Sequence, residues 1–172
     1  MDEAMIEDEG ARPGLDARSA GRDAGAAGSV DAKAAVPFAL IIDDQEPICQ
    51  VVAMALTQLG VESASYPTAG PAIASLDQRQ PAIIFLDVAL EQSDAIDVIK
   101  GLSEKRYKGI VQLMSGGRAP LLEAIQRIGA RFGLVLTPPL RKPFRRDDIR
   151  DAIAGAGLAG NVSPPPISTG PL

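Results

Sequence analysis

The chain has 172 residues, a length that favours one folded domain, and a net charge of −5 at pH 7. It contains no histidine, which excludes serine and cysteine hydrolases with a histidine base, the usual zinc sites, and a phosphohistidine on this chain. The single cysteine, Cys49, excludes an internal disulfide and fits a reducing compartment. We interpret Cys49 as a small core residue.

No apolar run reaches the roughly 18 residues that a membrane helix needs. The first ten residues are strongly acidic, so they fit neither a signal peptide nor a transit peptide. We therefore expect a soluble cytoplasmic protein that has no membrane partner.

Composition divides the chain into three segments. Residues 1–36 carry eight acidic and four basic side chains and no aromatic residue, which predicts a disordered N-terminal arm. Residues 37–155 form the predicted folded domain, and residues 156–172, which end in the proline-rich NVSPPPISTGPL, form a predicted flexible tail. Most of the net charge lies in the arm. The nearly neutral folded segment argues against nucleic-acid binding.

The first half of the folded segment alternates between apolar runs and amphipathic patterns. FALII (38–42) is an uninterrupted apolar run typical of a buried strand. Pro47 suits the first turn of the helix that follows, and Gly60 suits its end. The predicted elements of this half are strands at 38–42, 61–66 and 82–87 and helices at 46–59 and 68–78.

The second half continues the alternation. Asp94 opens a helical pattern of apolar residues, and GIVQLMS (109–115) is a further strand. Pro138 and Pro139 follow the last apolar run, and proline belongs at a sheet edge or a strand end because it cannot donate to a ladder. The predicted elements of this half are helices from Asp94, at 120–131 and at 147–154, and strands at 109–115 and 132–137.

The alternation of strands and helices predicts an α/β fold, with a parallel sheet covered by helices on both faces. Nearly continuous apolar strands support this prediction, because such strands are buried on both sides.

Reactive side chains follow the strands. The first strand ends at Asp43 and Asp44, the third at Asp87 and the fourth at Ser115, and Lys142 follows the fifth. The carboxyl ends of parallel strands meet at one edge of a sheet, so we expect these groups to converge there. Three adjacent carboxylates repel one another, and a divalent cation with oxygen ligands, best Mg²⁺, relieves the repulsion.

One carboxylate in such a site can act as a nucleophile on phosphorus and form an aspartyl phosphate. Phosphoryl transfer depends mainly on positioning and on neutralising the equatorial oxygens. Lys142 can supply a cation to one oxygen and Ser115 a hydroxyl donor to another.

These residues resemble the receiver domain of two-component response regulators, over about 37–155. The resemblance implies a flavodoxin-like, doubly wound sheet of five strands in the order 2-1-3-4-5. The motifs that carry it are IIDDQEP (41–47), IIFLDV (83–88), DAIDVI (94–99), MSG (114–116) and RKPF (141–144).

The resemblance also implies a role for each site residue. Asp87 matches the phosphoacceptor, and Ser115 and Lys142 match the residues that contact the phosphoryl oxygens. The Lys142–Pro143 bond matches one that is typically cis. The implied Mg²⁺ ligands are Asp43, Asp44, Asp87 and the backbone carbonyl of Ala89.

The implied function is that of a stand-alone, single-domain response regulator in a phosphorelay. A histidine kinase or phosphotransfer protein would phosphorylate Asp87, and the chain would signal by phosphorylation-dependent binding to a downstream protein whose identity the sequence does not give. We expect no enzymatic activity beyond self-catalysed phosphotransfer and autodephosphorylation. Pro139 stands where the family often carries an aromatic residue, so the sequence leaves open whether the switch works without one.

Two other functions stay open. An aspartate-nucleophile phosphohydrolase has a similar fold, but it needs a second acid two residues after the nucleophile, where this chain has Ala89. A degenerate receiver that acts as a constitutive scaffold is the other alternative, because Pro139 departs from the family pattern.

Two further sequence features resemble binding sites, and we interpret both as having no binding function. GAGLAG (155–160) matches a dinucleotide-binding pattern in letters only, since it follows a helix instead of a strand. The arginines around the last helix are interpreted as a solvated face, with an acidic partner or a homodimer as the alternative. They are Arg141, Arg145, Arg146 and Arg150.

Overall fold

The computed structural model describes residues 36–91, 95–117 and 119–158. Most of the predicted arm and tail, and the predicted helix start at Asp94, lie outside these residues, so the predictions about them stay untested. None of the helices in the described part of the chain combines the length and apolar composition that crossing a bilayer requires.

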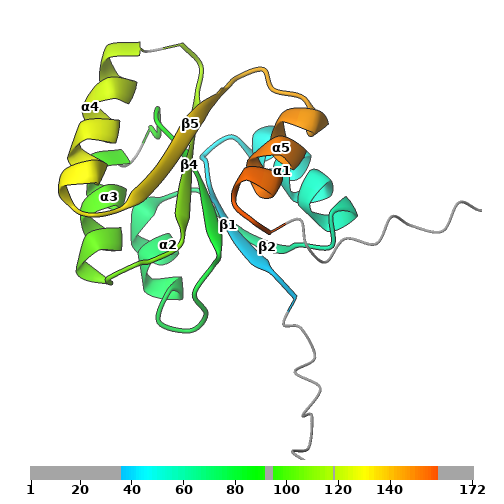
Figure 1. Cartoon of the computed structure of the whole chain (residues 1–172), viewed down its shortest axis with the longest axis horizontal. Coiled ribbons are helices and arrows are strands. Elements are labelled where there is room, and N and C mark those ends of the chain that lie inside the picture. The colour runs from blue at the N-terminus through cyan, green and yellow to red at the C-terminus, as the bar shows by residue number, and fades with distance from the viewer. Residues whose placement is uncertain (1–35, 92–94, 118, 159–172) are drawn as a thin grey trace, which may run out of the picture. The chain divides into compact units, whose positions relative to one another are not determined.

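Strands and helices alternate along the whole described segment (Figure 1). The strands are β1 (Phe38–Ile42), β2 (Glu62–Tyr66), β3 (Ile83–Asp87), β4 (Ile110–Ser115) and β5 (Val135–Arg141). The helices are α1 (Glu46–Gln58), α2 (Ala69–Ser75), α3 (Ala95–Glu104), α4 (Ala119–Arg131) and α5 (Arg146–Gly155). All pairings are parallel, in the order β2-β1-β3-β4-β5, which confirms the predicted flavodoxin-like fold.

The helices cover both faces of the sheet. α1 and α5 lie on one face, and α2, α3 and α4 lie on the other (Figure 1). Successive side chains of each strand point to opposite faces, so the strands feed two separate cores. Leu40, Leu86 and Leu113 pack in the core under α2, α3 and α4. Phe85 and Met114 pack in the core under α1 and α5.

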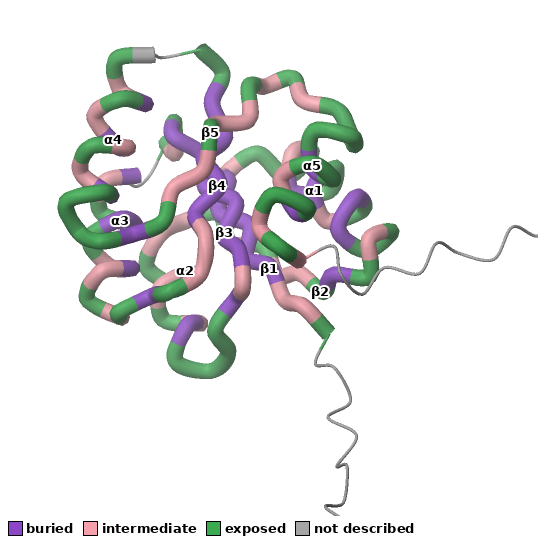
Figure 2. The backbone as a smooth tube through the Cα atoms, in the orientation of Figure 1, coloured by how far each residue is buried: buried purple, intermediate pink, exposed green. Residues whose placement is uncertain are grey.

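Burial separates the middle of the sheet from its β5 edge (Figure 2). Every residue of β3 is buried, as are all residues of β1 except Phe38. No residue of β5 is fully buried, and Val135 in it is 54% exposed. Strands buried on both faces need continuous apolar sequence, which explains why β1 and β3 were readily predicted.

Local sequence and turn geometry determine where α1 and α2 end. α1 carries Pro47 in its first turn, and Gly60 follows it with a φ of +69°, a conformation that glycine adopts without strain. The helix predicted from Thr68 to about Gln78 ends earlier, at Ser75. Beyond that point Leu76 donates to the carbonyl of Ile73, three residues back, so the chain tightens into turns.

The predicted position of the last strand was wrong. We expected it at 132–137, ending at the two prolines, but β5 spans Val135–Arg141 and contains both. β5 is an edge strand, where a missing donor can face away from the ladder, and its pairing with β4 is irregular at the prolines. The expectation that these prolines lie at a sheet edge is confirmed.

Candidate functional site

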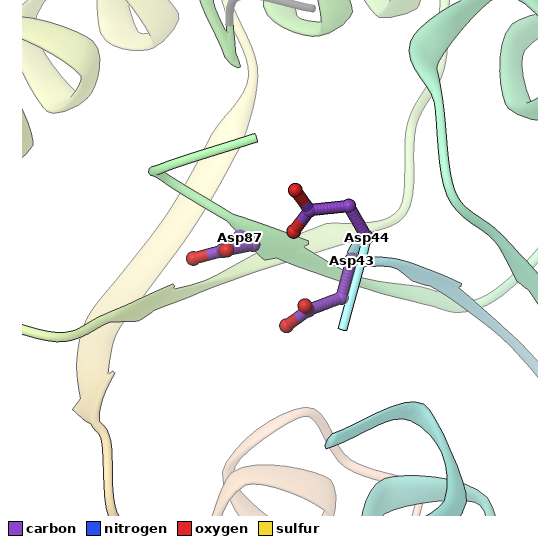
Figure 3. A group of neighbouring side chains, drawn as sticks. All are labelled: Asp43, Asp44 and Asp87. Carbon is purple, nitrogen blue, oxygen red and sulfur yellow. The ribbon is translucent and has the colours of Figure 1, made fainter. Parts of the chain in front are cut away.

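The three acids lie where two neighbouring central strands end. Asp43 and Asp44 follow β1 directly, and Asp87 is the last residue of β3. β1 and β3 pair in parallel through Ile42 and Leu86, which brings their carboxyl ends to the same edge of the sheet. Figure 3 shows the three carboxylates gathered beyond these strand ends.

The carboxylates are close together and largely shielded from water. One oxygen from each of Asp43, Asp44 and Asp87 lies within 4.8 Å of the others. Asp43 and Asp87 are each only 1% exposed. Like charges at this separation, away from bulk water, repel strongly, so the site needs cations.

Lys142 supplies one of these cations from the far edge of the sheet. Its Nζ lies 2.6 Å from Oδ2 of Asp43 and 3.1 Å from Oδ2 of Asp87, and its side chain is 12% exposed. Its backbone N–H donates to the carbonyl of Ser115 over 2.8 Å, which extends the β4–β5 ladder by one bond. The expected convergence of this lysine on the acids is what the structure shows.

Backbone donors hold two of the acids in place. The N–H of Gln45 donates to Oδ1 of Asp43 over 2.9 Å, and the N–H of Glu91 donates to Oδ2 of Asp44 over 3.0 Å. The second bond ties the loop after β3 to the end of β1.

Some carboxylate oxygens at the site lack a hydrogen-bond partner. Oδ1 of Asp44 and Oδ1 of Asp87 are buried and accept no hydrogen bond from the described residues. Orphaned, anionic oxygens in a group of three acids are the ligands that Mg²⁺ prefers. The residues present therefore fit a hard divalent cation.

Opposing influences act on the pKa of Asp43. Burial raises the pKa of its carboxyl above the ordinary value, and the charge of Asp87 adds to the rise. The hydrogen bonds from Lys142 and from the N–H of Gln45 oppose the rise without cancelling it. One lysine thus compensates the acids only in part.

The other predicted site residues lie on the same rim. Ser115 ends β4 and is 3% exposed, and its Oγ accepts a hydrogen bond from the N–H of Gly117 over 3.3 Å. Ala89 is exposed in the turn after β3. The Lys142–Pro143 bond is cis, as expected. The roles of Ser115 and of the Ala89 carbonyl stay predictions.

Sequence reasoning missed the backbone tethers and one buried side chain. Gln45 lies two residues after Asp43, the spacing at which an aspartate commonly accepts from the backbone, so that tether had a local signal. The tether from Glu91 joins residues far apart in sequence and had none. The buried side chain is Gln112, and its signal in the sequence is a polar residue inside the apolar run of β4.

Comparisons with known proteins agree with this geometry. The family model described as response regulator receiver domain matches residues 39–154. The chain therefore belongs to this family, and its folded segment is the receiver domain of a response regulator in two-component signalling.

Among curated proteins the chain is similar to the photosynthetic apparatus regulatory protein RegA. The RegA of Rhodovulum sulfidophilum is 35% identical over 133 residues, which cover 76% of this chain and 67% of that protein. The RegA of Rhodobacter capsulatus is 27% identical over 128 residues, which cover 74% and 65%. The chain thus spans about two thirds of the length of these relatives.

Solved structures show the same fold. NtrX from Brucella abortus in complex with ADP superposes with a TM-score of 0.62 at 25% identity, covering 70% of this chain and 26% of that one. The chemotaxis protein CheY4 of Vibrio cholerae superposes with a TM-score of 0.62 at 19% identity, covering 71% of this chain and 99% of that one.

Proposed function

We propose that the chain accepts a phosphoryl group on Asp87 and signals through the modified form. The observation that carries the proposal is the setting of the Asp87 carboxylate. It ends a fully buried strand, its Oδ1 accepts no hydrogen bond from the described residues, and a lysine and two further acids surround it. An acid that only supported the fold would be expected to have its hydrogen bonds satisfied.

Asp43, Asp44 and Asp87 would hold a Mg²⁺ ion, with the carbonyl of Ala89 as a further ligand. When bound, the ion neutralises negative charge on the carboxylates and on a phosphoryl oxygen. The orphaned oxygens of Asp44 and Asp87 support this assignment.

The chain's own residues would position the phosphoryl group. A carboxylate oxygen of Asp87 forms the new O–P bond as the P–N bond of a donor phosphohistidine breaks, and the imidazole leaves with the bonding electron pair. Lys142 Nζ, already 3.1 Å from Asp87, would pair with an equatorial oxygen, and the Ser115 hydroxyl would donate to another. This chain has no histidine, so the phosphohistidine belongs to a partner, a histidine kinase or phosphotransfer protein.

The modified domain would act by binding a downstream protein. An added phosphoryl group changes the charge at the ends of β1, β3 and β4 and shifts the population of rim conformations. We propose no enzymatic activity apart from self-catalysed phosphotransfer and autodephosphorylation. A cytoplasmic location is proposed because the one cysteine is a buried free thiol, which fits a reducing compartment.

The stand-alone arrangement and the homodimer stay predictions. About a third of each RegA relative lies outside the aligned part. The size of the native protein detected in cell extracts, and its mass in solution with and without a phosphodonor, would test both.

Incubation with acetyl phosphate and Mg²⁺ tests the proposal. We expect intact-mass spectrometry to show one added phosphoryl group that is labile in base, and Asp87→Asn to abolish it. Asp77→Asn, which alters an exposed acid that pairs with Lys105 and is not one of the three clustered acids, is the matched control and should leave the modification unchanged. No modification of the folded wild-type chain, or equal modification of Asp87→Asn, would reject the proposal.

The identity of the partners needs a separate experiment. Affinity capture from the native cell with phosphorylated protein and with Asp87→Ala as bait should recover proteins that bind only the phosphorylated form. Identical captures by both baits would show that phosphorylation does not control binding.

A further inference from the structure

Gln112 is a buried amide in the middle of β4. It is 2% exposed, yet its neighbours along the strand are apolar. Its Nε2 donates to the carbonyl of Pro138 over 2.6 Å, and its Oε1 accepts from the hydroxyl of Thr137 over 2.7 Å. A third, longer contact runs from Nε2 to the carbonyl of Leu113. The two short hydrogen bonds of this costly buried group are therefore made to β5.

Those two bonds lie where the β4–β5 pairing is irregular. The register runs from Gln112 opposite Thr137 directly to Met114 opposite Leu140. Pro138 and Pro139 together lie opposite the single residue Leu113 of β4. β5 therefore carries one extra residue, a β-bulge.

The extra residue changes which β5 side chains face the acids. Asp87 is paired with Met114, so both point to the face covered by α1 and α5. Leu140, opposite Met114, points to that face too, and by alternation so does Lys142. In an unbroken pairing every later β5 residue would move by one position, and Arg141 would take the face that Lys142 now occupies.

Side chains leave open space beside the bulge. A cavity of about 400 Å³ lies between β5 and α5, lined by both prolines, Thr137 and Gln112 among others. Pro139 is only partly buried and Pro138 is exposed. With open space on this side, the hydrogen bonds of Gln112 are the specific contacts that hold the extra residue in place.

We propose that Gln112 is a positioning residue for phosphoryl transfer, since it holds the bulge that directs Lys142 instead of Arg141 into the acidic site. The role of Gln112 in phosphoryl transfer rests on the proposed function. The register claim itself concerns the resting protein and can be tested without a phosphodonor.

The first experiment follows the Lys142 ammonium group by ¹H–¹⁵N NMR, with its signal assigned through Lys142→Arg. Pairing with two buried carboxylates slows exchange of the ammonium protons, so the wild-type signal should be observable. Gln112→Met keeps the side-chain volume but makes neither hydrogen bond, and we expect it to abolish the signal. The exposed Gln78→Met is the control and should retain it. Retention of the signal in Gln112→Met would overturn the inference.

The second experiment is a rescue by deletion. Removing Pro139 takes away the extra residue, so an unbroken strand again places Lys142 on the acidic face and no longer needs Gln112. We therefore expect Gln112→Met to leave the Lys142 signal unchanged in the deletion background. Loss of the signal there, in protein with a cooperative thermal transition, would show that Gln112 acts through general core packing and would overturn the inference.

Phosphorylation by acetyl phosphate gives the matching functional readout. We expect the rate to fall by roughly tenfold to a hundredfold in Gln112→Met and to recover in the double variant. The register shift would turn Lys142 away from the acidic face, and even a misplacement of about 1 Å can cost about a hundredfold in rate. Failure of the rate to follow the NMR signal would overturn the role of Gln112 in transfer. A wild-type chain that takes no phosphoryl group while the NMR results hold would overturn only the proposed function.

Discussion

β3 and β5 bring oppositely charged groups to the same site by different structural means. β3 is buried at every position and pairs regularly on both sides, so Asp87 is placed by an apolar strand that has little freedom. β5 is an edge strand with exposed residues, two prolines and an irregular register, and it places Lys142 through one buried amide on its neighbour. Packing thus positions the acid Asp87, whereas specific hydrogen bonds position the cation Lys142.

The largest expected effect comes from truncating the packed strand. Phe85→Ala in β3 should lower the free energy of unfolding by about 3–5 kcal/mol, because the side chain is fully buried in the core under α1 and α5. Val135→Ala in β5 should cost less than about 0.5 kcal/mol, because Val135 is 54% exposed. Urea denaturation measures both. Equal losses of stability in the two variants would show that side-chain packing contributes as much to β5 as to β3.

The next largest effect on stability is expected from removing the positive charge of Lys142. Lys142→Met should destabilise the metal-free protein by about 2 kcal/mol, less than for a wholly buried pair, because two shielded carboxylates lose their partner but the site opens to solvent. The exposed neighbour Arg141 provides the control, and Arg141→Met should change stability by less than about 0.5 kcal/mol. If both variants were equally stable, the ion pairs of Lys142 would contribute nothing to the fold.

A divalent cation should produce a somewhat smaller change. Mg²⁺ at about tenfold its Kd should stabilise the wild-type chain by about 1.4 kcal/mol. Asp87→Asn should raise the metal-free stability by about 1 kcal/mol, because it relieves repulsion, and should abolish most of the metal effect. Thermal unfolding with Mg²⁺ and with EDTA measures both quantities. An unchanged midpoint in the wild-type chain would count against a metal site.

The smallest effect is the pH dependence that Asp43 contributes. Its pKa is raised in the folded state above 3.8, so the folded chain binds the proton more tightly than the unfolded chain. The contribution of Asp43 to stability is therefore greatest below pH 3.8 and falls as pH rises through the folded pKa. Denaturation in EDTA, compared between the wild-type chain and Asp43→Asn, isolates this slope. If the stability of the wild-type chain relative to Asp43→Asn rose with pH instead, the pairing with Lys142 would lower the pKa of Asp43 more than burial raises it.

The contrast between the strands also explains how far sequence could go. β1 and β3 follow the simple rule for strands buried on both faces, so their bounds and the acids that end them were predictable from local sequence. The bounds of β5 were not, because its bulge depends on Gln112, which is 25 residues away from Thr137 in the chain. The meeting of Lys142 with the acids was predictable from the rule that the carboxyl ends of parallel strands share one edge of the sheet. The shorter contact of Lys142 with Asp43 than with Asp87 is set by three-dimensional geometry alone.

Fluorine NMR with beryllofluoride, a mimic of the phosphoryl group, tests the central claim most directly, since it reports where the group binds. We predict bound-fluoride signals for the wild-type chain that require Mg²⁺, persist in Asp77→Asn and vanish in Asp87→Asn. Signals that persist in Asp87→Asn, or that form equally well in EDTA, would contradict the assignment of Asp87 as the phosphoacceptor of a magnesium site.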